Sequence, residues 1–417
     1  MADSVTAPTA ASPHAPESAP RVPAPARPAA PPPDAPARTP DTYVDVRTQE
    51  LQINMGPQHP STHGVLRVAL WVDGEIVTRA DPDIGYLHRC AEKIGESVTN
   101  IQYVPYTDRE DYLAAMNNNL GYCLAVEKVA ELEVPERAQY IRTIAVELNR
   151  IGSHLMAVGT YGLDVGAFTP FFYAFREREE ILRLLEWICG ARLTYNFIRV
   201  GGVMRDAPDG WVADILKFLD VFEKRLDEFD DLLTWNHIFV QRTANVGVIP
   251  LEQALAYGLT GPNLRGSGLR YDLRREAPYL LYDRFEFDIP IGTGKKGTLG
   301  DCWDRYWVRM LEMRESVRIV RQAISQLPQG GEIMAKNVRH LAFKSKPGEG
   351  YFAIENPRGE FGYYLISEGA ANSYRSRCRA PSFCNLSILE AILPGTMLAD
   401  AVAIIGSIDI VLGEVDR

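Results

Sequence analysis

Two long stretches near the middle of the sequence carry apolar residues at alternating spacings of four and three, and this pattern constrains the fold more than any other feature. One stretch runs from Ile215 to Leu233 and the other from Met310 to Leu327. Such spacing gives each helix one apolar stripe. Two stripes of similar length favour helices that pack side by side in an antiparallel bundle. We therefore expect the stripes to form core, not cofactor contacts.

Two earlier segments are also predicted to be helical. Pro135 is typical of a helix start, and apolar residues then follow at spacings of three and four as far as Val158. Pro170 is predicted to open a further helix that runs toward Ile188. The helical bundle is therefore expected to occupy residues 85–330.

Short strands are predicted on either side of this bundle. Residues 65–72 alternate in polarity, and Asp73-Gly74 is a strong tight-turn signal before the next alternating run. This pattern predicts an N-terminal β-hairpin sheet within residues 43–80. Strand patterns return at 350–355 and 362–367, so residues 340–417 are expected to hold β strands and an apolar C-terminal segment. The predicted fold class is α+β, a central antiparallel helical bundle framed by small sheets.

The first 42 residues differ in composition from the rest. They hold 12 of the 28 prolines, with alanine filling much of the remainder. A segment with so little apolar surface is expected to be a disordered tail, and it fits neither a secretory signal nor a transit peptide. The folded domain is therefore expected to span residues 43–417.

Charge and hydropathy exclude some classes of protein. The formal net charge is −10, which argues against a nucleic-acid binder because such proteins usually carry a basic surface. The longest apolar run, 391–413, contains Pro394, Asp400 and Asp409 and is predicted to be core, not a membrane-spanning helix.

The six cysteines lie at wide spacings, and none forms a Cys-x-x-Cys pair. This distribution argues against a zinc ribbon or a self-contained iron-sulfur site. We expect buried, reduced thiols and no metal bound by this chain.

The densest polar cluster is Gly56-Pro-Gln-His-Pro-Ser-Thr-His-Gly64. Two glycines and two prolines constrain this loop, which holds His59 and His63, and such a constraint suggests that the side chains have a function. Either histidine alone could equally be a structural hydrogen-bonding residue.

Two further clusters contain candidate functional groups. In Pro105-Tyr-Thr-Asp-Arg-Glu-Asp-Tyr112 a helix is predicted to begin, and its tyrosines could donate a proton or pack on a surface. In Gly159-Thr-Tyr-Gly-Leu-Asp-Val-Gly166 a helix is predicted to end, which leaves Asp164 in a glycine-rich break. That carboxylate could hold an imidazole tautomer or cap the next helix.

Several motifs together resemble one family. They are Gly56-Pro-Gln-His-Pro-Ser-Thr-His-Gly-Val-Leu-Arg67, Ile84-Gly-Tyr-Leu-His-Arg89, Thr169-Pro-Phe-Phe-Tyr-Ala-Phe-Arg-Glu-Arg178, Gly201-Gly-Val, Glu312-Met-Arg-Glu-Ser316, Ala380-Pro-Ser-Phe383 and Gly413-Glu-Val-Asp-Arg417. They resemble the signatures of the D-type subunit of NADH-quinone oxidoreductases, the quinone-site subunit of respiratory complex I. The likeness runs in order from about residue 50 to the last residue.

The resemblance implies a site in which the quinone head group lies between a histidine and a tyrosine. By position these are His63 and Tyr112, with Asp164 as the partner of the histidine, and the implied quinone-binding residues also include His59, Ser61 and Thr62. Ordinary pKa values of about 6.5 for histidine and about 10 for tyrosine make His63 the readier proton donor. Asp164 would stabilise the protonated imidazole.

The same family is related to the large subunit of nickel-iron hydrogenases, whose metal centre is held by two Cys-x-x-Cys pairs. The matching regions here offer only Cys90 and the cysteine-free segment 407–413. Because such a centre requires thiolate ligands, hydrogenase activity is excluded. The scaffold is expected to be hydrogenase-like.

Electrons are therefore expected to arrive from an iron-sulfur cluster on an adjacent subunit. The resemblance places Arg89 beside that cluster, although an ordinary buried salt bridge is an alternative. Relatives often carry a histidine near the cluster, and the matching position is read as Tyr195. A neutral tyrosine predicts a cluster potential that depends less on pH.

The resemblance also implies the surroundings of the chain. It would be a peripheral-arm subunit on the cytoplasmic side of the inner (cell) membrane, with NADH and FMN on other subunits. The implied partners are the iron-sulfur subunit, other peripheral-arm subunits and a membrane subunit that lines the quinone channel. Quinone reduction would drive proton translocation by the membrane subunits. A related complex fed by ferredoxin or another donor, without an NADH module, remains an alternative.

Overall fold

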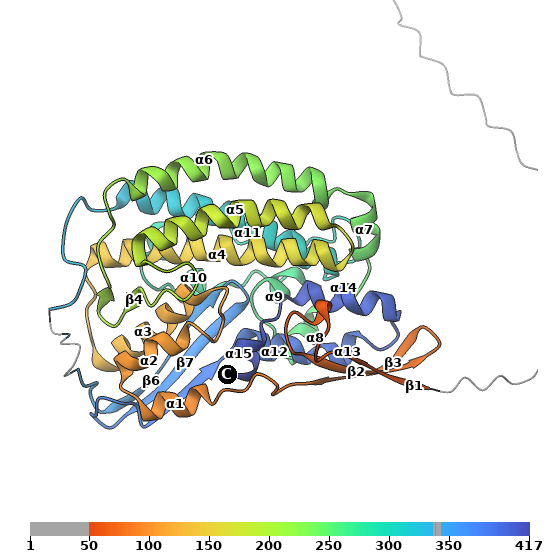
Figure 1. Ribbon diagram of the computed structural model, residues 1–417, viewed down its shortest axis with the longest axis horizontal. Coiled ribbons are helices and arrows are strands. Elements are labelled where there is room, and N and C mark those ends of the chain that lie inside the picture. The colour runs from red at the N-terminus through yellow and green to blue at the C-terminus, as the bar shows by residue number, and fades with distance from the viewer. Residues whose placement is uncertain (1–49, 337, 339–342) are drawn as a thin grey trace, which may run out of the picture. The chain divides into compact units, whose positions relative to one another are not determined.

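Four long helices lie side by side and form the core of the protein in the computed structural model, which describes residues 50–336, 338 and 343–417 (Figure 1). They are α4 (Glu136–Asp164), α5 (Phe168–Cys189), α6 (Trp211–Phe229) and α11 (Cys302–Gln326). Helix α4 packs against α5 and α11, and α6 packs against the same two helices. Neighbouring helices run in opposite directions, so the predicted antiparallel bundle is confirmed.

Helix boundaries follow local capping. Pro135 is the N-cap of α4, as expected of a helix start. Helix α5 begins two residues before Pro170, which therefore lies in the first turn, where its missing N–H leaves no bond unmade. The apolar stripe of α6 continues through a π-helical turn, Asp230–Thr234.

Two small antiparallel sheets lie below the bundle in Figure 1. The first is formed by β1 (Leu51–Met55), β2 (Arg67–Asp73) and β3 (Ile76–Asp83), with β2 in the middle. The predicted hairpin is present, since Asp73 pairs with Ile76 across the Asp73-Gly74 turn. The second is formed by β6 (Gly348–Asn356), β7 (Gly359–Ser367) and β8 (Arg375–Arg379). The third strand, β8, was not predicted.

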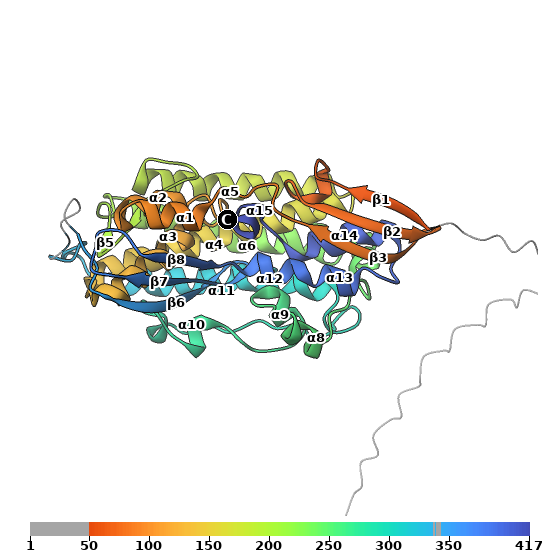
Figure 2. The ribbon, with the colours of Figure 1, turned by 90° about the horizontal axis from the view of Figure 1, so that it is seen from below.

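Helix α3 (Ala115–Ala130) joins the second sheet to the bundle, because it packs against β6, β7 and α4 (Figure 2). Gly121 permits the close contact, since a Cβ there would lie 3.4 Å from Ile354 and 3.5 Å from Phe361. The short helices that precede α3 are α1 (Ala91–Ser97) and α2 (Asn100–Thr107), and β4 (Ile198–Arg199) pairs with β5 (Gly202–Val203).

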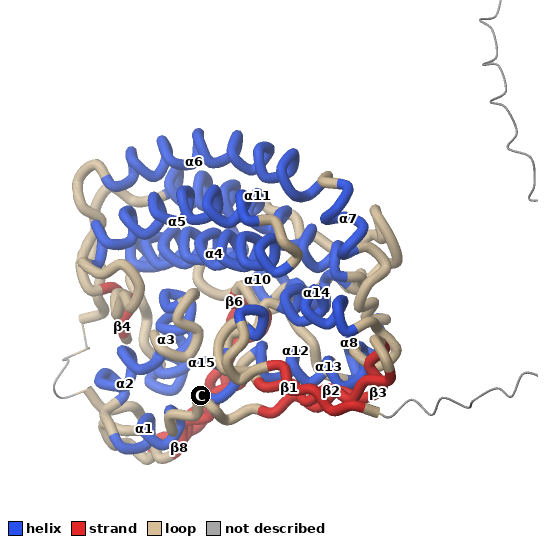
Figure 3. The backbone as a smooth tube through the Cα atoms, turned by 45° about the vertical axis from the view of Figure 1, so that its right-hand side comes forward, coloured by secondary structure: helices blue, strands red, loops and turns tan. Residues whose placement is uncertain are grey.

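Short helices connect α6 to α11 and complete the C-terminal region (Figure 3). The connecting helices are α7 (His237–Thr243), α8 (Leu251–Ala256), α9 (Pro262–Gly266) and α10 (Leu273–Glu276), with a 3-10 turn at Tyr282–Arg284. The C-terminal helices are α12 (Pro381–Ser387), α13 (Leu389–Ile392), α14 (Leu398–Ile408) and α15 (Leu412–Asp416). Helix α14 packs on α4, α11 and the 3-10 turn Pro60–Thr62.

Other predictions can be compared with the described residues. The predicted tail, residues 1–42, lies outside them. No described helix has the length and hydropathy of a membrane span. All six cysteines are free, but Cys90 is exposed and Cys384 is half-buried, so the expectation of buried thiols is wrong for these two.

Candidate functional site

A cavity of about 410 Å³ lies where the first loop, the C-terminal end of α4, the α2–α3 loop and the α14–α15 connection meet. It is lined by Pro60, Ser61, His63, Tyr112, Leu113, Met156, Thr160, Leu163, Asp164, Phe168, Arg358, Asp409, Ile410 and Val411. All three residues predicted to be catalytic, His63, Tyr112 and Asp164, are therefore on its wall.

The first loop fixes the position of His63. Gly56 is required there, because its φ is +84° and a Cβ would lie 2.0 Å from the Leu66 carbonyl oxygen. His59 caps the following 3-10 turn by accepting the Ser61 amide N–H. His63 ends this turn in a left-handed conformation, with φ 51°. Its Nε2 lies 2.6 Å from Oδ2 of Asp164.

Asp164 is the last residue of α4, as the glycine-rich break predicted. Helix α14 passes close to it, since a Cβ on Gly406 would lie 2.6 Å from its Oδ2. Burial disfavours the charged imidazole of His63, but the hydrogen bond and negative charge of Asp164 outweigh burial and raise the pKa of His63 above 6.5. His63 is therefore held in its protonated form near neutral pH.

Tyr112 lies in the loop between α2 and α3. The prediction that a helix begins within residues 105–112 is wrong: α2 ends at Thr107 and α3 begins at Ala115. The side chain of Asp111 ends the loop by accepting the amide N–H groups of Leu113 and Ala114. Burial raises the pKa of Tyr112 above 10, so its hydroxyl keeps its proton unless the proton is replaced.

A buried arginine closes the floor of the cavity. Arg358 comes from the β6–β7 turn, and its side chain is fully buried. Its guanidinium donates to both oxygens of Asp111, at 2.8 and 3.1 Å, and to Oδ1 of Asp409 at 3.1 Å. With His63 protonated, the charged lining residues Arg358, Asp164, Asp409 and His63 balance, as buried charges require.

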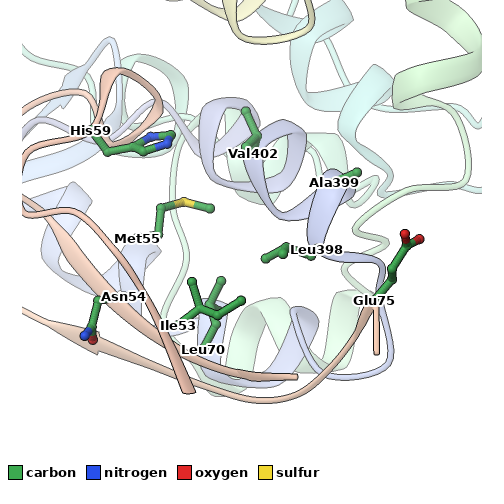
Figure 4. Close-up of a pocket in the computed structure, with 9 residues that line it drawn as sticks. All are labelled: Ile53, Asn54, Met55, His59, Leu70, Glu75, Leu398, Ala399 and Val402. Carbon is green, nitrogen blue, oxygen red and sulfur yellow. The ribbon is translucent and has the colours of Figure 1, made fainter. Parts of the chain in front are cut away.

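The other residues predicted to bind quinone are distributed differently. Ser61 lines the cavity. Thr62 is buried, and its hydroxyl donates to the His59 carbonyl oxygen. His59 lines a second cavity of about 460 Å³, formed mainly by apolar residues of β1, β2 and α14 (Figure 4). The first loop thus separates the two histidines, and the structure does not bring His59 and His63 together.

Arg89 lies against the C-terminal segment. Its guanidinium donates to the carbonyl oxygens of Arg109, at 2.7 Å, and Gly413, at 2.9 Å. No ion pair joins it to any residue that the structure describes, so the alternative of an ordinary salt bridge is wrong for that part of the chain. The guanidinium charge is therefore not neutralised by a described carboxylate.

Tyr195 is buried in the α5–β4 loop. The next residue, Asn196, donates its amide N–H to Oδ2 of Asp108, at 3.2 Å. Burial raises the pKa of Asp108 to about 7, against the hydrogen bonds that this carboxyl accepts. A group that titrates near neutral pH therefore lies beside Tyr195, and the sequence reading missed it.

Metal ligands are not grouped. Within the described ranges, no three His, Cys, Asp or Glu residues form a set that could hold a metal ion. The bond between Arg89 and Gly413 brings the segment that contains Cys90 against the cysteine-free C-terminal segment. The chain thus presents one thiol in this region.

Three lining residues on α4 and two charged ones were missed from the sequence. Met156, Thr160 and Leu163 follow at helical spacing before Asp164, and such a pattern looks like core. Asp409 could have been noticed as a charge inside an apolar run. Arg358 gave no signal, because an arginine in a tight turn is normally exposed.

Comparison with known proteins agrees with this arrangement. Residues 164–346 and 337–417 match the family described as respiratory-chain NADH dehydrogenase, 49 Kd subunit. The chain is therefore one component of an oxidoreductase complex. It belongs to the family of the 49 Kd subunit, which includes the D-type subunit of NADH-quinone oxidoreductases, and its partners are other subunits of complex I.

Curated relatives are similar over almost their whole length. A D-type subunit (D 1) of NADH-quinone oxidoreductase from Anaeromyxobacter sp. (strain K) is 54% identical over 374 residues, which are 90% of this chain and 98% of the relative. The D-type subunit of NADH-quinone oxidoreductase from Bacillus mycoides (strain KBAB4) is 51% identical over 371 residues, 89% of this chain and 100% of the relative. The predicted family is confirmed.

Proposed function

We propose that the cavity lined by His63, Tyr112 and Asp164 is the quinone-reduction pocket of an NADH-quinone oxidoreductase. The observation that supports this most is the 2.6 Å contact between His63 Nε2 and Asp164 Oδ2 on the wall of a cavity that Tyr112 also lines. Quinones carry two carbonyl oxygens on opposite sides of the ring. The cavity offers one protonated donor for each oxygen.

Reduction of a quinone to a quinol consumes two electrons and two protons. The His63 imidazolium donates a proton to one carbonyl oxygen, and the Asp164 carboxylate stabilises the imidazolium before transfer. The Tyr112 hydroxyl donates a hydrogen bond, and then a proton, to the other oxygen. Ser61 lies on the same wall and is available to position the head group.

The electrons reach this pocket from an iron-sulfur cluster on an adjacent subunit, with Arg89 and Tyr195 on the side of the chain that faces it. The uncompensated charge of Arg89 favours the reduced cluster there. NADH and FMN belong to other subunits, and membrane subunits couple the reaction to proton translocation. The chain itself is peripheral, on the cytoplasmic side of the inner (cell) membrane. The names of the relatives favour NADH over ferredoxin as the electron source.

The test is NADH:quinone reductase activity in native membranes that carry Tyr112→Phe. NADH:ferricyanide activity in the same membranes reports whether the electron-input modules have assembled. Tyr106→Phe is the matched control, because Tyr106 lies on the preceding helix and is exposed. We expect quinone reduction to collapse in Tyr112→Phe alone, while ferricyanide reduction persists in both variants.

Two other outcomes are informative. Full quinone reduction in Tyr112→Phe means that the tyrosine is structural and that the pocket lies elsewhere. Membranes that reduce quinone with ferredoxin but not with NADH, in a host without genes for a flavin-binding and NADH-binding subunit, identify the alternative electron donor.

A further inference from the structure

Glu414, in α15, is a fully buried acid whose bonds are incomplete. Its Oε1 accepts the amide N–H of Ser382 at 3.0 Å, but its Oε2 has no hydrogen-bond partner among the described residues. No salt bridge joins it to a described cation. A charged carboxylate in such surroundings is strongly disfavoured, whereas a protonated carboxyl is tolerated.

The groups that face Glu414 come from several elements. They are Asp111 and Tyr112 from the α2–α3 loop, Arg358 from the β6–β7 turn, Cys378 from β8 and Ser382 from α12. Burial, followed by the negative charge of Asp111, raises the pKa of Glu414 to about 8, against Arg358 and the hydrogen bonds from Ser382. Glu414 therefore carries a proton at neutral pH.

Other acids near Tyr112 are already engaged. Glu110 accepts hydrogen bonds from the hydroxyl groups of Tyr103 and Tyr363. Asp111 is bound through both oxygens by Arg358. Among these neighbours, Glu414 is the acid that combines a proton with an oxygen free to move it.

The α15 backbone lies directly against Tyr112. A Cβ on Gly413 would lie 3.1 Å from Cε1 of the Tyr112 ring, so the residue that precedes Glu414 packs on the ring itself. Tyr112 also responds to the charge of Glu414, which contributes to the rise in its pKa. The two groups are thus electrostatically linked and separated by little more than one residue of backbone.

We propose that Glu414 supplies the second proton of quinone reduction by re-protonating Tyr112. This inference rests on the proposed function. With the two electrons delivered by the partner subunit, the quinone oxygen beside Tyr112 takes the hydroxyl proton, so the O–H bond of Tyr112 breaks and that of the quinol forms. The Glu414 carboxyl then gives its proton to the tyrosine oxygen and becomes a carboxylate. Each donor of the pocket is therefore served by one carboxyl group, Asp164 behind His63 and Glu414 behind Tyr112.

The far end of α15 offers a route for the proton to return. Asp416 and Arg417 line a separate cavity of about 290 Å³, whereas Val411 lines the quinone cavity. Glu414 lies between these residues in the chain. The short helix thus stands between a second cavity and the pocket, and Glu414 can take up a proton from one side and release it to the other.

The main test is Glu414→Gln in the assembled enzyme in native membranes. Glutamine has the same shape, and its amide oxygen can still accept the Ser382 N–H, so a purely structural role is preserved. We expect kcat for quinone reduction to fall about a hundredfold, with little change in KM and with ferricyanide reduction intact. The infrared band of a protonated carboxyl that changes on quinone reduction should also be lost.

A second variant shifts the proton affinity without removing the acid. Because the Ser382 hydroxyl lowers the pKa of Glu414, Ser382→Ala should raise that pKa, and the loss of activity on the alkaline side should move to higher pH. This variant tests the proposal even where Glu414→Gln does not assemble. An unmoved alkaline limb in Ser382→Ala, or full activity in Glu414→Gln, overturns the role of Glu414.

The two proposals fail in different ways. If Tyr112→Phe reduces quinone normally, the pocket itself is misplaced and the role of Glu414 falls with it. If Tyr112→Phe is inactive while Glu414→Gln keeps wild-type kcat and pH profile, the pocket stands and only the proton supply through Glu414 is wrong.

Discussion

The imidazole of His63 and the carboxylate of Asp164 meet at 2.6 Å although 101 residues separate them in the chain. One stands on a constrained loop before the second strand and the other on the last residue of a 29-residue helix. Both supports are rigid, so the pair is pre-organised. This relationship sets the pH range in which the proposed proton donor is charged.

Replacing Asp164 should shift the pH dependence of quinone reduction. In Asp164→Asn the charge that raises the pKa of His63 is gone, while burial still lowers it. His63 donates only when protonated, so the alkaline limb of NADH:quinone reductase activity should move to lower pH. The ion pair stabilises the fold fully below the unfolded pKa of about 6.5, and this stabilisation is lost as pH rises through the higher folded pKa.

The matched control is Asp209→Asn, because Asp209 is an exposed carboxylate on a loop. Its pH profile should coincide with that of the wild type. An alkaline limb that stays in place in Asp164→Asn means that this carboxylate does not control the charge of His63.

Local patterns were sufficient to predict the bundle, the hairpin and the identity of the three main site residues. Stripes such as Ile215–Leu233 specify helices, because helical period and burial are linked through a short range of sequence. The conversion of Asp164 from a helix end into a partner of His63 could not be derived from spacing. It depends on how α4, α14 and the first loop pack, and only the resemblance suggested it.

The charged floor of the cavity shows the limit more clearly. Arg358 sits in a two-residue turn between strands, a place where arginine normally points into water. It is buried because the turn is folded against the α2–α3 loop, where Asp111 and Asp409 receive the guanidinium. Long-range charge pairing of this kind leaves no periodic signal in the sequence.

The two histidines of the first loop should differ in their effect on activity. His63→Asn removes the proposed donor, so quinone reduction should fall about a hundredfold or more. His59→Asn keeps an N-cap side chain for the Ser61 amide and changes a different cavity, so most activity should remain. Steady-state NADH:quinone and NADH:ferricyanide assays on both variants make the comparison. Equal losses in the two variants would mean that both histidines reach the substrate.

Gly413→Ala should disturb the position of Tyr112. The new Cβ would lie 2.4 Å from the Glu110 carbonyl oxygen and 3.1 Å from Tyr112 Cε1, so the α2–α3 loop must shift. Because a donor displaced by about 1 Å can cost a hundredfold in rate, quinone reduction should fall while ferricyanide reduction persists. Gly330→Ala is the control, since its Cβ would meet no atom within 4 Å. Wild-type kinetics in Gly413→Ala contradict the close packing of this segment.

Arg358→Met should destabilise the protein more than any surface change on the same sheet. The substitution leaves the carboxylates of Asp111 and Asp409 buried without their partner, which costs about 3–5 kcal/mol for a broken buried ion pair. Thermal inactivation of ferricyanide reduction in native membranes measures the effect, because that activity does not use the pocket. Arg377→Met is the matched control, since Arg377 is an exposed arginine of β8 that forms no ion pair with a described residue. We expect the inactivation temperature to fall clearly in Arg358→Met and to stay at the wild-type value in Arg377→Met. Equal inactivation temperatures in the two variants would mean that Asp111 and Asp409 are neutral in the folded protein and need no compensating charge.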